Sequence, residues 1–477
     1  MESQRNLKEL LKIKNLLPTV LSAIFVFLIV GSFSYLIFFK VLLFISFPLV
    51  FLLIMLLISK TSRNIETSFK VFILLSVFAL LDINLYYKYA LYLLMVFYLI
   101  ITYFKIKELK ISPPEFFVFI IFLYILSSFI SAFLSEHNFA KALIYSTGYS
   151  ITLISILAIS FALSHDSILN IFKFTILAAL IPALVLILLQ IPPLRELPFE
   201  RYDFGILFFP VFFHPNSLGL IFSYSIPIVI YFWLENIKIK FVNLEINPLL
   251  LLIIFSIFLS ISVSRTSILS LFIFCIFLGI LWKEKRKKIL SFLAIYFLFI
   301  ICGILIIYFS IPAPKKHFFS LWKLGLGLTK RDILWSHTLK IIKENWITGI
   351  GPGNIFETLA LSLRRIPIFS HLTSISPHNT YLRILAENGI IGLSLYLGAL
   401  IYIIWSFLIQ RKLFKINLVK LLSSVFFMIL IRQAFETNSF GGLEFDSVYF
   451  LIYSFLLVRT IKDTTIIPME QAIKEKI

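Results

Sequence analysis

The chain has 477 residues, of which 60% are hydrophobic and only 14% are charged. Soluble domains contain about 45–50% apolar and about 25% charged residues, so this composition excludes an ordinary soluble protein. The apolar residues suffice for roughly fourteen membrane spans of about 20 residues each, which leaves no room for a separate soluble catalytic domain. The formal charge of +19 would suggest nucleic-acid binding in a soluble protein. In a multi-pass chain it indicates basic cytoplasmic loops instead, and we expect no nucleic acid as a partner.

Apolar segments of spanning length follow one another along most of the chain. The first is longer than the apolar part of a signal peptide and lacks a small-residue cleavage site, so we expect a retained span. The first two are joined only by Lys40 and form either two spans or a re-entrant hairpin. We therefore expect an all-α, polytopic membrane bundle of about twelve to fourteen transmembrane helices. The expected spans are residues 17–39, 41–59, 69–87, 89–104, 116–134, 143–163, 171–189, 213–234, 249–263, 267–282, 289–310, 389–409, 420–437 and 447–460.

The charges of the connectors predict the orientation of the bundle. Lys and Arg gather in alternate connectors, most densely in the KEKRKK run at residues 283–288, which places both termini in the cytoplasm. The connector at residues 164–170 is an exception, because it has neither Lys nor Arg. Three regions follow: transmembrane helices in 1–310, one large extracytoplasmic, partly helical loop in 311–388, and C-terminal transmembrane helices with a cytoplasmic tail in 389–477.

The large loop contains a helical pattern followed by a glycine-rich turn. Apolar residues recur at helical spacing in residues 330–346, which predicts an amphipathic helix lying on the membrane or on the bundle. The GIGPG segment at 349–353 resembles a phosphate loop only superficially. No strand precedes it and no Lys-Ser/Thr pair follows it, so we interpret it as a turn.

Arg265, in the segment SVSRTSIL, interrupts a continuous apolar stretch from residue 249 to residue 282. As one helix this stretch would be about 50 Å long, against a hydrocarbon core of about 30 Å, so we expect a break near Arg265. The basic segments on both sides place that break at the outer face, with the large loop. Arg265 then either binds an anion or extends to the lipid headgroups.

Two further residues of the loop have chemistry that suits an active site. Arg331 follows Lys330 at the start of the expected loop helix, where cations and backbone amides bind phosphate, although exposed arginines at helix ends are also common. His378 lies in the segment SPHNTYLRILAENGIIGL, just before the next span. Histidines titrate near neutral pH, which makes His378 either a general base at the outer surface or an ordinary loop residue.

The segment HPNSLG at 214–219 opens another span at the outer face. His214 and Asn216 are candidates for ligand binding there, with a Pro/Asn helix cap as the alternative. The loop histidines have no HxxxH spacing, so we expect no metal site.

Four segments in order resemble the O-antigen ligase and polymerase superfamily of bacterial membrane glycosyltransferases. They are FHPNSLG at 213–219, SVSRTSIL at 262–269, KRDILWSHTLKIIKENWITGIGPGNIF at 330–356 and PHNTYLRILAENGIIGL at 377–393. The resemblance covers roughly the second half of the chain. It implies metal-independent and cofactor-independent transfer of a glycan from undecaprenyl diphosphate at the periplasmic face of the cell inner membrane.

The resemblance also implies roles for individual residues. Arg265 and Arg331 match the arginines that engage the lipid diphosphate, and His378 matches the histidine that takes a proton from the acceptor hydroxyl. Beside them, Asn379 either orients His378 or caps the following helix. Arg383 is a candidate for phosphate or sugar contact, with headgroup anchoring as the alternative.

The acceptor distinguishes several functions that share this donor chemistry. We expect a ligase that moves O-antigen onto lipid A-core; the alternatives are a polymerase that joins repeat units on the same carrier and a protein O-oligosaccharyltransferase. A polysaccharide or lipid transporter is the alternative from another class. Asp82, Arg432 and Glu436 are the polar residues that favour it, although their places near span ends also suit interfacial anchoring.

Overall fold

A computed structural model describes the second half of the chain most fully. The described residues are 66, 70, 73, 113–188, 201–204, 207–210, 215–241, 244–262, 264–310, 331–367, 369–410, 413, 415–436 and 445–474. The four spans expected before residue 105 therefore lie almost entirely outside the described residues, and their number stays a prediction.

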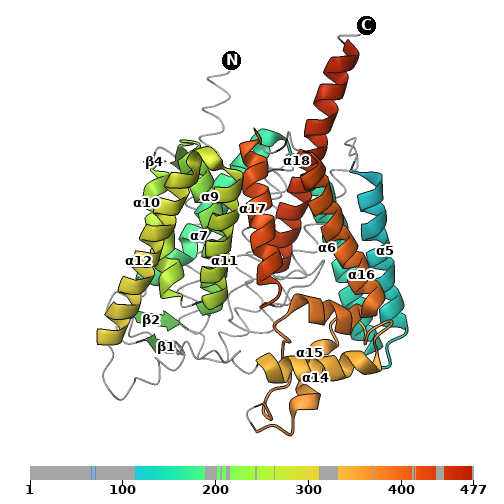
Figure 1. Ribbon diagram of the computed structural model, residues 1–477. Helices are drawn as coiled ribbons and strands as arrows, with labels where there is room; N and C mark the ends of the chain where they lie inside the picture. Colours follow the sequence, from blue (N-terminus) through green and yellow to red (C-terminus); the bar gives the residue numbers. More distant parts are fainter. Residues whose placement is uncertain are drawn as a thin grey trace, which may run out of the picture.

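The described part of the chain is an all-α helical bundle with two short β-hairpins, which confirms the expected fold class (Figure 1). The hairpins, which we did not predict, are β1 (Arg201–Phe204) with β2 (Leu207–Pro210) and β3 (Ile239–Phe241) with β4 (Leu244–Ile246). The helices are α5 (Glu115–Phe133), α6 (Phe139–Ala162), α7 (His165–Leu188), α9 (Pro215–Leu234), α10 (Pro248–Ile261), α11 (Arg265–Leu281), α12 (Arg286–Ser310), α14 (Arg331–Glu344), α15 (Ile355–Leu363), α16 (Thr380–Ile409), α17 (Asn417–Arg432) and α18 (Phe445–Lys474).

Within the described residues, five helices are long and apolar enough to cross a membrane, and a bent pair raises the number to six. The five are in α5, α6, α7, α9 and α16. The bent pair is α11 with the segment Lys283–Ile301, and it turns by 115° at the KEKRKK run. Helix α11 therefore ends at this basic turn and α12 begins there, on the side that the charge pattern assigns to the cytoplasm.

The expected break of the long apolar stretch is confirmed. Helix α10 ends at Ile261, and α11 begins at Arg265, the residue that interrupts the apolar pattern. Gly219 of α9 packs closely against this break, because a Cβ there would lie only 2.4 Å from the Cβ of Ser264. The glycine of the HPNSLG segment thus allows α9 to approach the start of α11.

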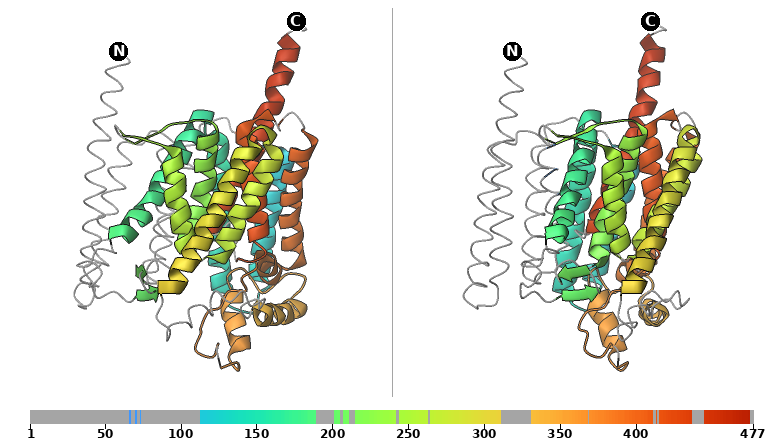
Figure 2. Two further views of the ribbon diagram at one scale, coloured as in Figure 1. Left: turned by 60° about the vertical axis from the view of Figure 1, so that its left-hand side comes forward. Right: turned by 90° about the vertical axis from the view of Figure 1, so that its left-hand side faces the viewer.

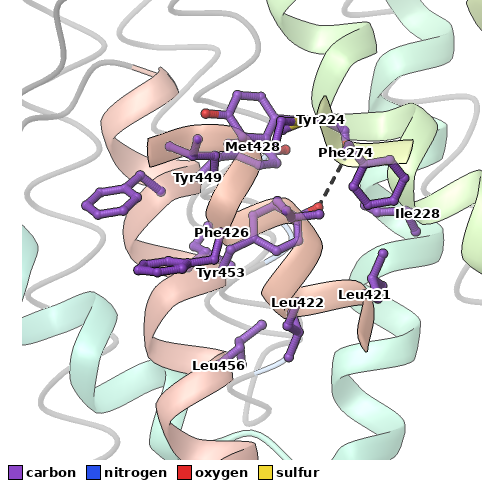
Figure 3. Close-up of a cluster of buried hydrophobic side chains, with 14 of the residues drawn as sticks. Tyr224, Ile228, Phe274, Leu421, Leu422, Phe426, Met428, Tyr449, Tyr453 and Leu456 are labelled. Atoms are coloured by element: carbon purple, nitrogen blue, oxygen red, sulfur yellow. Dashed lines mark hydrogen bonds between the residues drawn. The ribbon is translucent and has the colours of Figure 1, made fainter. Parts of the chain in front are cut away.

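The main hydrophobic core lies between the central helices. Helix α9 is the most enclosed of the candidate spans, because 89% of its residues Ser217–Leu234 are buried inside the protein. Figure 3 shows part of this core, where side chains of α9, α11, α17 and α18 meet. Tyr453 donates a hydrogen bond to the carbonyl oxygen of Tyr224 at 3.4 Å, which joins α18 to α9. The helices that carry polar residues to one end of the bundle are therefore fixed by close packing.

Helices α14 and α15 form a small separate unit at one end of the bundle, the end where α16 begins (Figures 1 and 2). The expected amphipathic helix is confirmed as α14, which buries Leu334, Ile341 and Ile342 in a second hydrophobic cluster. Residues of α15 and the following turn complete this cluster. We call the unit formed by residues 331–379 the loop domain.

The GIGPG turn attaches the loop domain to a kink in α16, and its interpretation as a turn is confirmed. Gly349, Gly351 and Gly353 all have positive φ angles. The amides of Ile350 and Gly351 donate to the carbonyls of Ala386 and Glu387, immediately before the kink at Gly389. A helix so bent loses regular hydrogen bonds, and the turn supplies replacements.

Candidate functional site

The carboxylate of Glu436 joins three of the segments that carry the sequence motifs. Its Oε1 accepts a hydrogen bond from Thr266 Oγ1 at 2.7 Å, in the first turn of α11. The same oxygen lies 3.7 Å from an Nη2 of Arg331, at the start of α14, and Oε2 lies 3.8 Å from Nδ1 of His378. Residues far apart in sequence therefore meet at one half-buried carboxylate. We call Arg265, Arg331, His378 and Glu436 the candidate site.

Arg265 and Arg331 reach this site from the starts of two helices. Arg265 is the first residue of α11, and its side chain is exposed, next to the Thr266 that binds Glu436. Within the described part of the chain, no ion pair or hydrogen bond involves the Arg265 side chain. Arg331 is the first residue of α14, and its side chain is 18% exposed. One guanidinium group is thus open to solvent while the other is partly held by Glu436.

The turn that carries His378 is held by several hydrogen bonds. His378 has a φ of 50°, a left-handed backbone conformation, and its amide donates to Ser376 Oγ at 3.1 Å. Trp335 of α14 donates from its indole nitrogen to the carbonyl of Pro377 at 2.9 Å. The imidazole itself is 43% exposed. The backbone is therefore fixed, while the ring remains accessible to a substrate.

Asn379 caps the helix that follows, which was one of its two expected roles. Its Oδ1 accepts the amide of Leu382 at 3.0 Å, in the first turn of α16. Its Nδ2 donates to the carbonyl of Ala434 at 3.1 Å, in the turn that leads to Glu436. Thr380 donates two further hydrogen bonds, from its amide to the carbonyl oxygen of Gln433 and from its hydroxyl to the carbonyl oxygen of Glu436. These contacts fix the relative positions of His378 and Glu436.

The electrostatics of the site favour an anion. Burial alone would raise the pKa of Glu436, but His378, Arg432 and the hydrogen bond from Thr266 lower it to about 2. Burial lowers the pKa of Arg331; Glu436 opposes this effect, and the nearby Arg265 charge adds to it. Glu436 therefore remains ionised at neutral pH. Because one carboxylate faces two arginines that repel each other, the site has an excess of positive charge.

This arrangement is suited to acid–base chemistry beside a bound anion. A carboxylate near Nδ1 of a histidine favours the tautomer with its proton on Nδ1, and Nε2 then remains available to accept a proton. The two arginines can stabilise negative charge that develops on a leaving group. Among the described residues, no group of three or more His, Cys, Asp or Glu side chains is placed to hold a metal ion.

The structure does not bring all the sequence candidates to this site. Arg383 is only 1% exposed and lies in a separate network: Nε donates to Glu387 at 3.1 Å, and an Nη donates to Tyr149 at 2.8 Å. Its guanidinium also lies over the ring of Phe356, with 4.6 Å between the carbon Cζ and the ring centroid. Arg383 therefore holds α16 against α6 and α15. His214, Lys330 and the side chain of Asn216 lie outside the described residues.

Glu436 is the site residue that sequence reasoning missed as a partner of His378. The sequence singled it out only as a polar residue near the end of a span, with Arg432. No spacing rule links it to His378, because 58 positions separate the two residues and one whole helical hairpin lies between them. Only the folded bundle shows that α17 ends beside the start of α16.

One comparison with known proteins identifies a family. Residues 250–397 match the family model described as O-antigen ligase. The match includes Arg265, Arg331 and His378, whereas Glu436 lies beyond it. A search of curated proteins gives no match. The segment 250–397, about a third of the chain, is therefore of the O-antigen ligase family, whose members are membrane enzymes of the ligase or polymerase type.

Proposed function

We propose that the protein is a glycosyltransferase that moves a glycan from undecaprenyl diphosphate to a hydroxyl of lipid A-core. The reaction takes place at the periplasmic face of the cell inner membrane and uses neither a metal nor another cofactor. The observation that carries this proposal is that Arg331 and His378 lie within 4 Å of Glu436, which also binds Thr266, the neighbour of Arg265. Arg265, Arg331 and His378 come from the segments that resemble the family, and they lie at the end of the bundle that carries the loop domain.

The proposed chemistry is a displacement at the anomeric carbon of the donor. His378 Nε2 takes the proton of the acceptor hydroxyl, and the hydroxyl oxygen forms a bond to the anomeric carbon. The bond between that carbon and the diphosphate oxygen breaks, and undecaprenyl diphosphate leaves with the electron pair. Arg265 and Arg331 stabilise the negative charge on the diphosphate. Glu436 orients His378 and stabilises the imidazolium that forms.

The position of the site suits a donor that is itself a membrane lipid. The candidate site lies where α11 and α16 begin, beside the loop domain, and α16 is a candidate membrane span. A diphosphate at headgroup level would reach the exposed Arg265 while its polyprenyl chain stays in the bilayer. We also predict further substrate-binding residues, namely His214, Asn216, Lys330, Asn379 and Arg383. Two of these, Asn379 and Arg383, already have structural roles.

Reconstitution with a lipid-linked oligosaccharide tests the proposed function. The purified protein in liposomes receives the donor with lipid A-core, with an acceptor peptide, or with no added acceptor. We expect glycan-capped lipid A-core in the first sample only. Longer lipid-linked chains without an acceptor would instead identify a polymerase of the same superfamily, and a modified peptide would identify a protein O-oligosaccharyltransferase. Movement of intact donor across the bilayer without transfer would contradict the enzyme assignment.

A further inference from the structure

A buried ion pair lies inside the bundle, one helical turn away from the candidate site. Nε of Arg432, the last residue of α17, donates to Oδ2 of Asp446 on α18 at 3.0 Å. The other carboxylate oxygen, Oδ1, accepts a short hydrogen bond from the hydroxyl of Tyr224 on α9. Arg432 and Asp446 are almost entirely excluded from solvent, so neither is available to bind substrate directly.

The Arg432 guanidinium also reaches the helix that carries Arg265. One Nη donates to Ser267 Oγ of α11 at 3.2 Å and to Ser223 Oγ of α9 at 3.3 Å. Ser267 is two residues after Arg265 and follows Thr266, which binds Glu436. A single side chain thus joins α17, α18 and α9 to the first turn of α11.

The backbone of Arg432 holds Glu436 directly. The amide of Glu436 donates to the carbonyl oxygen of Arg432 at 3.0 Å, which closes the last turn after α17. The Arg432 charge also contributes to keeping the pKa of Glu436 low. The residue that ties α11 to the bundle therefore also fixes the start of the turn that ends at Glu436.

A buried ion pair gives little net stability, because removing two charges from water costs about as much as their attraction returns. Replacing such a pair with apolar residues of similar volume is often neutral or stabilising. The geometric role of Arg432, with partners on three helices, is therefore separable from its contribution to folding. We propose that Arg432, held by Asp446, is a positioning residue that sets the placement of Glu436 and of the Arg265 turn in the candidate site.

This inference rests on the proposed function for its effect on catalysis, but its structural part can be tested alone. The test variant is Arg432→Met with Asp446→Leu, which removes both charges together and leaves no unpaired one. The matched control is Arg459→Met with Asp463→Leu, which removes another Arg–Asp pair on α18, with 3.2 Å between Nε and Oδ2. Both proteins are purified full-length in nanodiscs, and amide hydrogen exchange and glycan transfer are measured.

We expect faster exchange in residues 264–268, 378–381 and 433–436 of the test variant, with unchanged exchange in α15 and no change in the control. Transfer should fall about a hundredfold in kcat, with a smaller change in the KM for the donor, because misplaced catalytic groups mainly affect the chemical step. Unchanged exchange and transfer in the test variant would overturn the inference. A general increase in exchange over the whole bundle would also overturn it, since it would assign the pair to overall folding.

A second variant covers the case in which the double replacement does not fold. Arg432→Lys keeps the charge beside Asp446 but has no planar fork to reach Ser267 at the same time. We expect the same local increase in exchange at 264–268, and wild-type exchange there would contradict the proposal. If the wild-type protein transfers no glycan to any acceptor, the proposed function fails, and the exchange measurements still decide the role of Arg432.

Discussion

Glu436 has a chemical environment unlike that of an interfacial anchor, because its carboxylate lies between Thr266, Arg331 and His378. A carboxylate beside Nδ1 of a histidine selects the tautomer that leaves Nε2 basic. Its two oxygens here face different partners, so the side chain acts on the histidine and on an arginine together. This placement predicts that its loss affects the chemical step.

Glu436→Gln should lower kcat for glycan transfer by about a hundredfold, because an amide cannot stabilise the imidazolium that forms during proton transfer. Binding of the donor should change less, since both arginines remain. Steady-state kinetics with the reconstituted enzyme checks this expectation. Glu357→Gln, at an exposed position of α15, is the matched control and should keep wild-type kinetics, because Glu357 pairs with Lys141 at the surface, 2.8 Å away. Equal activity of both variants would exclude a role for Glu436.

Glu436 should also make stability depend on pH in the acid range. Its pKa is about 2 in the folded protein, against 4.5 as the ordinary value. A group with a lowered folded pKa contributes stability above its unfolded pKa, and that contribution is lost as the pH falls toward the folded pKa. The wild-type melting temperature should therefore fall between about pH 4.5 and pH 2, and the fall should be smaller in Glu436→Gln. Parallel melting curves for both proteins would contradict the low pKa.

The sequence predicted the other site residues to different degrees. Arg265 could be singled out from the sequence because a charge inside an apolar stretch is costly. His378 could be singled out because its motif directly precedes a span. Glu436 had no such signal, since a carboxylate at the end of a span also suits interfacial anchoring. Arg383 shows that a place in a motif does not fix where a side chain lies. Its motif lies next to His378, but its helical position turns the side chain toward Tyr149 and Glu387.

At the scale of elements, the kink in α16 fixes the loop domain relative to the span. Gly389 has a φ of 64° and a ψ of −169°, which an L side chain rarely adopts. A Cβ there would lie 2.0 Å from the carbonyl oxygen of Ile347. The amide of Ile390 donates to the carbonyl of Trp346 at 2.8 Å, so the loop chain crosses directly over the glycine.

Gly389→Ala should destabilise the protein by at least about 1–3 kcal/mol, from the strained backbone alone. The clash with Ile347 adds to this cost, and the displaced loop domain should lower transfer as well. Gly398→Ala is the matched control, because it lies in the same helix with no atom within 4 Å of its added Cβ. Thermal melting in detergent compares the two variants. Gly398→Ala should melt at or slightly above the wild-type temperature, and equal melting of both variants would contradict the account of the kink.

The sequence predicted those elements that depend on a local pattern, such as the length of an apolar stretch or helical periodicity. The break at Arg265 followed from the length of an apolar stretch, and α14 followed from helical periodicity. The Gly389 kink was not predicted, although the Asn388–Gly389 pair is a dipeptide typical of turns. The hairpins β1–β2 and β3–β4 were also missed, since they are short connectors whose pairing has no pattern of its own.

At the scale of the whole molecule, both ends of the bundle have distinct chemistry. The basic turn at Lys283–Lys285 lies at the opposite end from the loop domain and the candidate site (Figure 1). This separation agrees with the charge pattern of the connectors, which assigns the basic end to the cytoplasm. The orientation in the cell is a prediction that side-specific labelling can test.

Single cysteines at Ser336 and Lys287 should be labelled from opposite sides of the membrane. Both residues are exposed, one on α14 and one at the start of α12. In a parent without Cys275 and Cys302, Ser336→Cys should react with a membrane-impermeant maleimide in cells with a permeabilised outer membrane. Lys287→Cys should react only after lysis. Labelling of the two positions in the reverse order would place the candidate site in the cytoplasm and contradict the use of a periplasmic donor.

The most direct test of the central claim is transfer by a His378→Ala variant. His371→Ala is its matched control, because His371 is another exposed histidine of the loop domain and lies outside the candidate site. Both variants are reconstituted with lipid-linked oligosaccharide and lipid A-core, after equal insertion into liposomes has been verified. We expect wild-type transfer from His371→Ala and none from His378→Ala. Transfer at the wild-type rate by His378→Ala would contradict the assigned base and with it the proposed mechanism.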